Sequence, residues 1–270
     1  MDIVYIIAGF GVGALVGLTG VGGGALMTPL LIFGFGVAPA VAVGTDLMFA
    51  AITKATGVWT HARLGSVEWP IVRRLLLGSL PAALLTLLVL QRIDVHTDAA
   101  QDLMTTTLGI ALMISAAALL FRRRLAQGNE EGSREGNRLQ RLQGHPLQGS
   151  GDKKTRIATV VTGVVLGVLV TMTSVGAGAL GAAALFWLYP RISAARVVGT
   201  DLAHAVPLAA VAGIGHWQMG TVDWVLLGSL LIGSLPGIYC GSRLSARVPE
   251  VWLRSVLASL LLLIGLRLVA

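Results

Sequence analysis

Four ionisable side chains lie inside apolar segments of this chain of 270 residues. Asp46 and Asp201 each follow Gly-Thr, Lys54 comes eight residues after Asp46, and His204 comes three residues after Asp201. Ionisable groups within a membrane are energetically unfavourable and mark functional sites. We expect Asp46, Asp201 and His204 to exchange protons, with capping of a helix start as the structural alternative for the two carboxylates. Lys54 is expected to balance the charge of an anion or to form a buried ion pair with Asp46 or Asp201.

Two glycine-rich hexapeptides carry the remaining candidate groups, Thr19 to Gly24 (TGVGGG) and Thr173 to Gly178 (TSVGAG). Glycine N–H groups, the hydroxyls of threonine and serine, and the positive end of a restarting helix suit an oxyanion. Close helix packing by small residues is the alternative. The residues expected to bind substrate are Thr19, Gly20, Gly22, Gly23, Gly24, Thr45, Lys54, Thr173, Ser174, Gly176, Gly178 and Thr200.

An internal duplication relates these groups to one another. Residues 43–47 (VGTDL) recur as 198–202, and residues 78–81 (GSLP) recur as 233–236, both at an offset of 155. Each half begins with an apolar stretch of some 33 residues that its hexapeptide interrupts, and three further apolar segments follow. Because a helix of about 20 residues crosses a bilayer, each opening stretch must be two shorter helices.

The composition limits the class of protein. Apolar residues make up 55% of the chain and charged residues only 12%, about half the charge of a soluble domain. A single cysteine and the lack of a Cys/His cluster predict no disulfide, no metal site and no cofactor. We therefore expect an all-α polytopic membrane protein with two inverted repeats, each a broken or re-entrant helix pair followed by three transmembrane helices.

Charge placement predicts the topology. The segment from Arg122 to Arg156 holds nine basic and four acidic residues, so it carries +5 of the net charge of +7 and indicates a flexible cytoplasmic linker, not a nucleic-acid surface. The chain then divides into a first transmembrane repeat (1–121), the linker (122–156) and a second repeat (157–270). If each opening stretch enters and returns, five arginines of the second half join the linker on one side, and both termini lie outside: Arg191, Arg196, Arg243, Arg247 and Arg254.

Inverted repeats with broken helices are typical of secondary transporters. Two other classes stay open at this point. A passive anion channel could use the same donors. An intramembrane serine protease could pair Ser174 with His204 or His216, although Ser174 lacks the Gly-x-Ser-x-Gly turn of that chemistry.

Over nearly its whole length the sequence resembles the sulfite exporter TauE/SafE family. The residues that carry the resemblance are Gly20 to Gly24 followed by Pro29, the twin Gly-Thr-Asp-Leu motifs and Gly-Ser-Leu-Pro of the third segment. The resemblance implies proton-linked transport of a small sulfur-containing anion, such as sulfite, an organosulfonate or a related oxyanion, across a bacterial inner membrane. The partners expected are that anion, protons and the lipid bilayer, with no nucleic acid; assembly into a homo-oligomer is left open. Ala177 departs from the glycine triplet of the first half.

Overall fold

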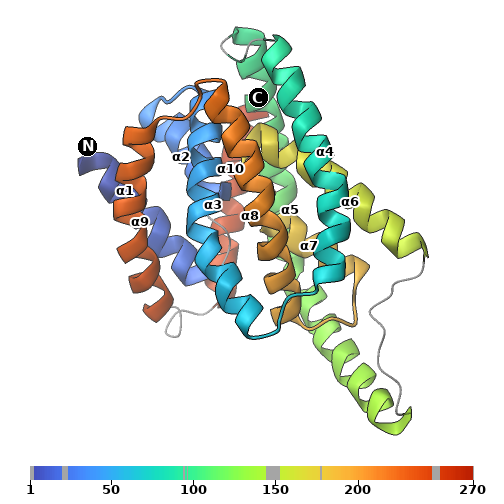
Figure 1. The fold of residues 1–270 in the computed structure, drawn as a ribbon. Coiled ribbons are helices and arrows are strands. Elements are labelled where there is room, and N and C mark those ends of the chain that lie inside the picture. The colour runs from blue at the N-terminus through green and yellow to red at the C-terminus, as the bar shows by residue number, and fades with distance from the viewer. Residues whose placement is uncertain are drawn as a thin grey trace.

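A computed structural model describes residues 3–19, 24–93, 95, 97–143, 153–176, 178–244 and 250–269. In these ranges the only regular secondary structure is α-helix (Figure 1). The helices are α1 (Ile3–Thr19), α2 (Gly24–Phe35), α3 (Pro39–Arg63), α4 (Trp69–Ile93), α5 (Asp98–Gln143), α6 (Lys153–Thr173), α7 (Ala179–Leu188), α8 (Ala194–Gln218), α9 (Trp224–Leu244) and α10 (Glu250–Val269).

Six of these helices contain a stretch long and apolar enough to cross a membrane: α3, α4, residues 98–120 of α5, α6, α8 and α9. Large apolar side chains on their outer faces, such as Leu84, Leu85 and Leu88 of α4, are more than half exposed. An apolar surface this extensive requires a nonaqueous surrounding. The prediction of a multi-pass all-α membrane protein is therefore confirmed.

Both opening stretches are broken helices, as their length predicted. α1 and α2 are separate helices, as are α6 and α7. In Figure 1, α1 descends from the N-terminus and α2 returns to the end of the bundle where α3 begins. The second break contains Gly176 and Gly178 at φ 129° and 137°, and Ser174 at φ 58°. Left-handed backbone favours glycine, so Ser174 is strained; it is the one non-glycine residue with positive φ in the described ranges.

The two halves exchange their first helices. α1 packs along α9 of the other half, and α6 packs along α4. A methyl group on Gly13 would lie 2.4 Å from the Ser234 carbonyl oxygen, and one on Gly167 would lie 2.4 Å from the Ser79 carbonyl oxygen. Small residues let the backbones approach this closely, as at many membrane helix interfaces. The matching contacts interlock the two halves.

α3 and α8 lie side by side at the centre and run in opposite directions (Figure 1). The N- and C-termini lie at one end of the bundle, and the last part of α5 projects from the other end. The ends of α3 and α9 and the beginning of α8 share the end from which α5 projects. These helix ends carry Arg63, Arg196 and Arg243.

One expectation needs correction. The segment 122–156 is not flexible throughout, because α5 continues as one helix to Gln143 and α6 begins at Lys153. The residues that extend α5 are rich in Arg, Leu, Gln and Glu, which favour helix, and the sequence sets glutamates three or four positions before arginines, as in Glu130 and Arg134. Residues 144–152 lie outside the described residues.

Candidate functional site

Asp46 of α3 is buried beside α2. The Thr28 hydroxyl of α2 donates a hydrogen bond of 2.6 Å to Asp46 Oδ2. Asp46 Oδ1 has no hydrogen-bond partner. One side of this carboxylate is therefore held by the broken helix of its own repeat, and the other oxygen is left for a further group.

Ser174 brings the break of the second repeat to the same carboxylate. Its hydroxyl is buried and lies close to the Asp46 carboxylate without forming a well-aligned hydrogen bond. The neighbouring Thr173 hydroxyl is engaged within its own segment, since it donates to the Leu169 carbonyl at 2.6 Å and accepts from the Val175 N–H at 3.1 Å. Ser174 is therefore the hydroxyl of this break that is available to a ligand.

Asp201 of α8 lies against the first turn of α7. A methyl group on Gly181 would come within 2.0 Å of Asp201 Oδ1, so only glycine leaves room for the carboxylate. The positive end of a helix stabilises a negative charge. Each aspartate thus meets the second helix of the broken pair in its own repeat, Asp46 at Thr28 and Asp201 at Gly181.

Lys54 and His204 complete the group. Lys54 of α3 is 8% exposed, and its ammonium interacts electrostatically with Asp201 and, more weakly, with Asp46. His204 of α8 is buried and lies close enough to Lys54 for the two side chains to interact electrostatically. His204 Nε2 forms a hydrogen bond of 2.9 Å with Ser79 Oγ of α4, whereas His204 Nδ1 has no hydrogen-bond partner.

We call this group the polar cluster: Thr28, Asp46, Lys54, Ser79, Ser174, Asp201 and His204. Buried polar atoms are nearly always hydrogen-bonded, so an unsatisfied one needs an explanation. Here three unsatisfied atoms come from α3, the α6–α7 break and α8: Asp46 Oδ1, Ser174 Oγ and His204 Nδ1. A buried cation beside such atoms can hold a small charged ligand and exchange protons with it.

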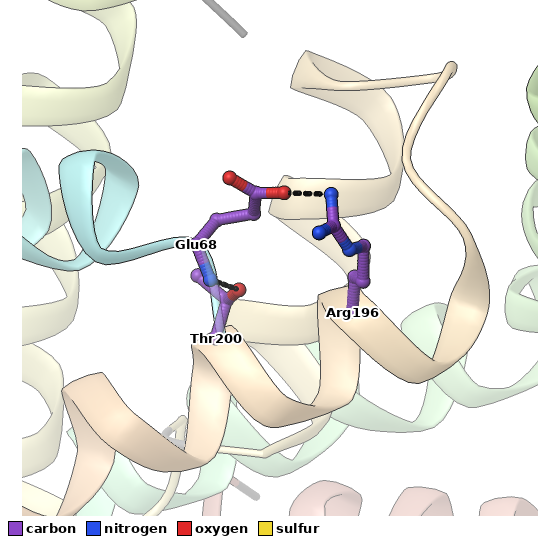
Figure 2. A network of polar contacts seen from close by, with 3 residues as sticks. All are labelled: Glu68, Arg196 and Thr200. Carbon is purple, nitrogen blue, oxygen red and sulfur yellow. Dashed lines mark hydrogen bonds and ion pairs between the residues drawn. The ribbon is translucent and has the colours of Figure 1, made fainter. Parts of the chain in front are cut away.

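Two other residues predicted to bind substrate, Thr45 and Thr200, form hydrogen bonds with backbone N–H groups. The Thr45 hydroxyl accepts the Asp223 N–H at 3.1 Å, and the Thr200 hydroxyl accepts the Glu68 N–H at 3.0 Å. Figure 2 shows the second of these bonds, together with the ion pair between Glu68 and Arg196. These threonines therefore attach each central helix to a loop of the other half: α3 to the loop before α9, and α8 to the loop before α4.

The first hexapeptide is described only at its ends. Thr19 ends α1 and Gly24 begins α2, and the structure describes their backbone alone. Gly20, Gly22 and Gly23 lie outside the described residues. In the second hexapeptide Gly176 and Gly178 form the turn itself. His216 is held by the Thr171 carbonyl and the Thr221 hydroxyl, at 3.0 and 2.9 Å.

Two residues of the polar cluster, Thr28 and Ser79, were not predicted from the sequence. Ser79 stood in the repeated Gly-Ser-Leu-Pro motif, which was a usable signal, but nothing distinguished Thr28 from other threonines. The site is also asymmetric, because Phe49 occupies the position in α3 that His204 occupies in α8, and Phe49 is buried. Among the described residues no three His, Cys, Asp or Glu side chains are grouped as metal ligands.

Comparison with known proteins supplies the family. The model of the family described as sulfite exporter TauE/SafE matches residues 5–268. The chain is 39% identical over 269 residues to the probable membrane transporter protein YjnA of Bacillus subtilis, covering 100% of both chains. It is 25% identical to the probable membrane transporter protein YdhB of Bacillus subtilis, over 93% of this chain and 94% of that one. No solved structure matches. The chain belongs to the sulfite exporter TauE/SafE family of membrane proteins.

Proposed function

We propose that this protein is a proton-linked secondary transporter that carries a small sulfur-containing anion by alternating access, with the polar cluster as its binding site. The observation that carries the proposal is the buried Lys54 ammonium between two carboxylates, beside three unsatisfied polar atoms. The family and its relatives named as membrane transporters support transport as the class of function.

Anion binding is coupled to proton binding because the two carboxylates and the anion compete for the charge of Lys54. With Asp46 and Asp201 ionised and Lys54 protonated, the three groups carry a net negative charge, which repels an entering anion. Protonation of one carboxylate neutralises the group and removes this repulsion, so an anion and a proton occupy the cluster together. The Ser174 hydroxyl can then donate to an oxygen of the anion, and His204 Nδ1 can exchange a proton with it. The anion and the proton each stabilise the binding of the other in the cluster. The two are therefore carried across the membrane in the same direction.

The broken helices supply the conformational change. The cluster receives Thr28 from the first broken pair and Ser174 from the second, so moving either pair against α3 and α8 alters the site. Two halves that run in opposite directions can exchange conformations and open the same site to either side. We place both termini outside and the α5 extension in the cytoplasm of a bacterial cell, because lysine and arginine concentrate on the cytoplasmic side.

Two alternative functions give different results. A passive channel would conduct anions without moving protons. A serine hydrolase would need a base on Ser174, yet the Ser174 hydroxyl has no hydrogen-bond partner and His204 bonds Ser79. Those contacts favour transport over hydrolysis.

Ligand-dependent thermal unfolding of the purified protein tests the binding site. Sulfite, sulfoacetate and sulfate are compared across pH, because a ligand at 100 times its Kd stabilises the folded state by about 2.7 kcal/mol. At least one sulfur anion is expected to raise Tm, more at lower pH. Lys54→Ala should abolish the shift, whereas Arg92→Gln, which removes an exposed cation, should keep it. An equal shift in Lys54→Ala would remove Lys54 from the site.

A further inference from the structure

An apolar groove of about 480 Å³ opens between α1, α2 and α10, away from the polar cluster. Leu15, Leu30, Phe33, Leu263 and Ile264 contribute to its walls, and Arg267 is the charged residue among those that line it. The volume falls within the range of about 300–1,000 Å³ that small-molecule sites have. The groove is therefore large enough for part of an elongated apolar molecule.

The equivalent helices around the other broken pair meet more closely. The duplication relates α1, α2 and α10 to α6, α7 and α5. α5 packs closely on α6 and α7, whereas α10 makes few contacts with α1 and α2. At the offset of 155, the counterpart of Arg267 is Leu112, which is fully buried. The duplicated fold does not require this looser packing, so the groove and its arginine are specific to the contact between the first broken helix pair and α10.

Length and charge identify the occupant. The lining runs from Leu26 to Gly34 on α2 and from Leu260 to Arg267 on α10, which are about 12 and 10 Å at 1.5 Å per residue. One leaflet contributes about 15 Å of hydrocarbon. Arg267 lies in the last turn of α10, with its guanidinium carbon 5.5 Å from the Phe33 ring centre. An arginine at a helix end reaches the headgroup layer while its stem covers apolar surface.

We infer that the groove binds one acyl chain of an anionic phospholipid, whose phosphate contacts Arg267. The chain fills the apolar length between α2 and α10, and the guanidinium supplies the complementary charge. Such a lipid would join α10 to the first broken helix pair. This inference does not depend on which anion the polar cluster carries.

Photo-crosslinking in vesicles of phosphatidylcholine and phosphatidylglycerol tests the inference. A phosphatidylglycerol probe with a diazirine on its acyl chain is irradiated with the full-length protein, and labelled peptides are mapped by mass spectrometry. Labelling should concentrate on residues 26–34 and 260–267. Arg267→Gln should lower it about fivefold, the effect of one cation near the membrane surface. Gly34→Leu, which fills the groove, should lower it similarly, and Arg92→Gln, in the last turn of α4, should leave it unchanged.

Three outcomes would overturn the inference. The first is labelling of the outer face of α4, at Leu84 and Leu88, as strong as labelling of the groove. The second is equal labelling by a phosphatidylcholine probe, which would remove the role of the negative headgroup. The third is a disulfide between two copies through Leu263→Cys in a Cys240→Ser background, which would show that a second protein chain covers the groove. A cooperative thermal unfolding transition with a Tm close to that of the wild type checks that Arg267→Gln is folded.

Discussion

At the residue scale, the central feature is one buried cation shared by two carboxylates. Asp46, Lys54, Asp201 and His204 could be predicted from the sequence because ionisable residues stand out in apolar segments. Thr28 could not, since threonines in such helices commonly bond their own backbone, as Thr86 does to the Ala82 carbonyl at 2.8 Å. Which threonine turns toward a neighbouring helix depends on helix packing.

Asp46→Asn should uncouple anion binding from pH. Asparagine keeps an oxygen that accepts from Thr28 but carries no exchangeable charge, so Lys54 faces one carboxylate instead of two and the second negative charge no longer repels the anion at any pH. The anion-induced rise in Tm is expected to persist in alkaline buffer, where the wild-type protein loses it. Asp98→Asn, which changes an exposed carboxylate at the start of α5, serves as the control. A variant with the wild-type pH profile would exclude Asp46 from coupling.

Thr28→Val should destabilise the protein by about 1–3 kcal/mol, because it leaves a buried carboxylate oxygen without its donor. Thr28→Ser should restore most of the loss. Denaturant unfolding in detergent measures both, with Thr86→Val as a control that removes only a bond within its own helix. Equal losses in Thr28→Val and Thr86→Val would mean that the contact with Asp46 adds nothing.

At the element scale, Thr45 and Thr200 attach the central helices to the loops before α9 and α4. A methyl group on Gly44 would lie 2.3 Å from the Thr221 carbonyl oxygen, and one on Gly199 would lie 2.7 Å from the Ser66 carbonyl oxygen. The sequence revealed the Gly-Thr-Asp repeat but not the different roles of its residues. Glycine and threonine contact a loop, and aspartate belongs to the polar cluster. Periodicity along one chain does not specify which helices meet.

Thr45→Val and Thr200→Val should therefore lower stability while leaving anion affinity unchanged. Each removes one acceptor from a backbone N–H, a loss of about 1–3 kcal/mol. Thermal unfolding gives the stability, and titration of Tm with sulfite gives the affinity. A tenfold weaker affinity without loss of stability would return these threonines to the binding site.

The Glu68–Arg196 ion pair distinguishes the two ends of the bundle (Figure 2). At the offset of 155, the counterpart of Glu68 is Asp223. Asp223 instead caps α9 by accepting the Val225 and Leu226 N–H groups, both at 2.9 Å. Arg196→Gln should change stability by less than about 1 kcal/mol, since the pair is partly exposed. It should also raise thiol labelling of Ser66→Cys in a Cys240→Ser background, because the loop before α4 loses one attachment. Unchanged labelling would mean that the ion pair does not restrain this loop.

At the scale of the whole molecule, the lengths of the apolar segments and the hexapeptide breaks predicted the helices. The helices match the predicted segments, and the termini lie opposite the α5 extension (Figure 1). The exchange of α1 and α6 between halves was not predicted, because it depends on backbone contacts at glycines such as Gly13 and Gly167. The continuation of α5 to Gln143 was also missed, since a charged composition alone does not distinguish a solvated helix from a flexible segment.

Thiol accessibility tests the orientation in the membrane. In a Cys240→Ser background, Asp98→Cys at the beginning of α5 should react with a membrane-impermeant maleimide in intact spheroplasts. Leu64→Cys, in the exposed loop between α3 and α4, should react only after permeabilisation. The opposite pattern would reverse the proposed orientation and leave the fold unchanged.

Proton movement in sealed proteoliposomes is the most direct test of coupled transport by the polar cluster. A pH-sensitive dye is enclosed, and an inward gradient of sulfoacetate or of sulfite is imposed without a pH gradient. Sulfoacetate is the decisive probe, because its sulfonate stays ionised and does not cross the bilayer as a neutral acid. The wild-type protein should acidify the lumen as the anion enters, and Lys54→Ala should reduce the signal to that of empty liposomes. Anion entry without acidification, or acidification that survives in Lys54→Ala, would contradict the account.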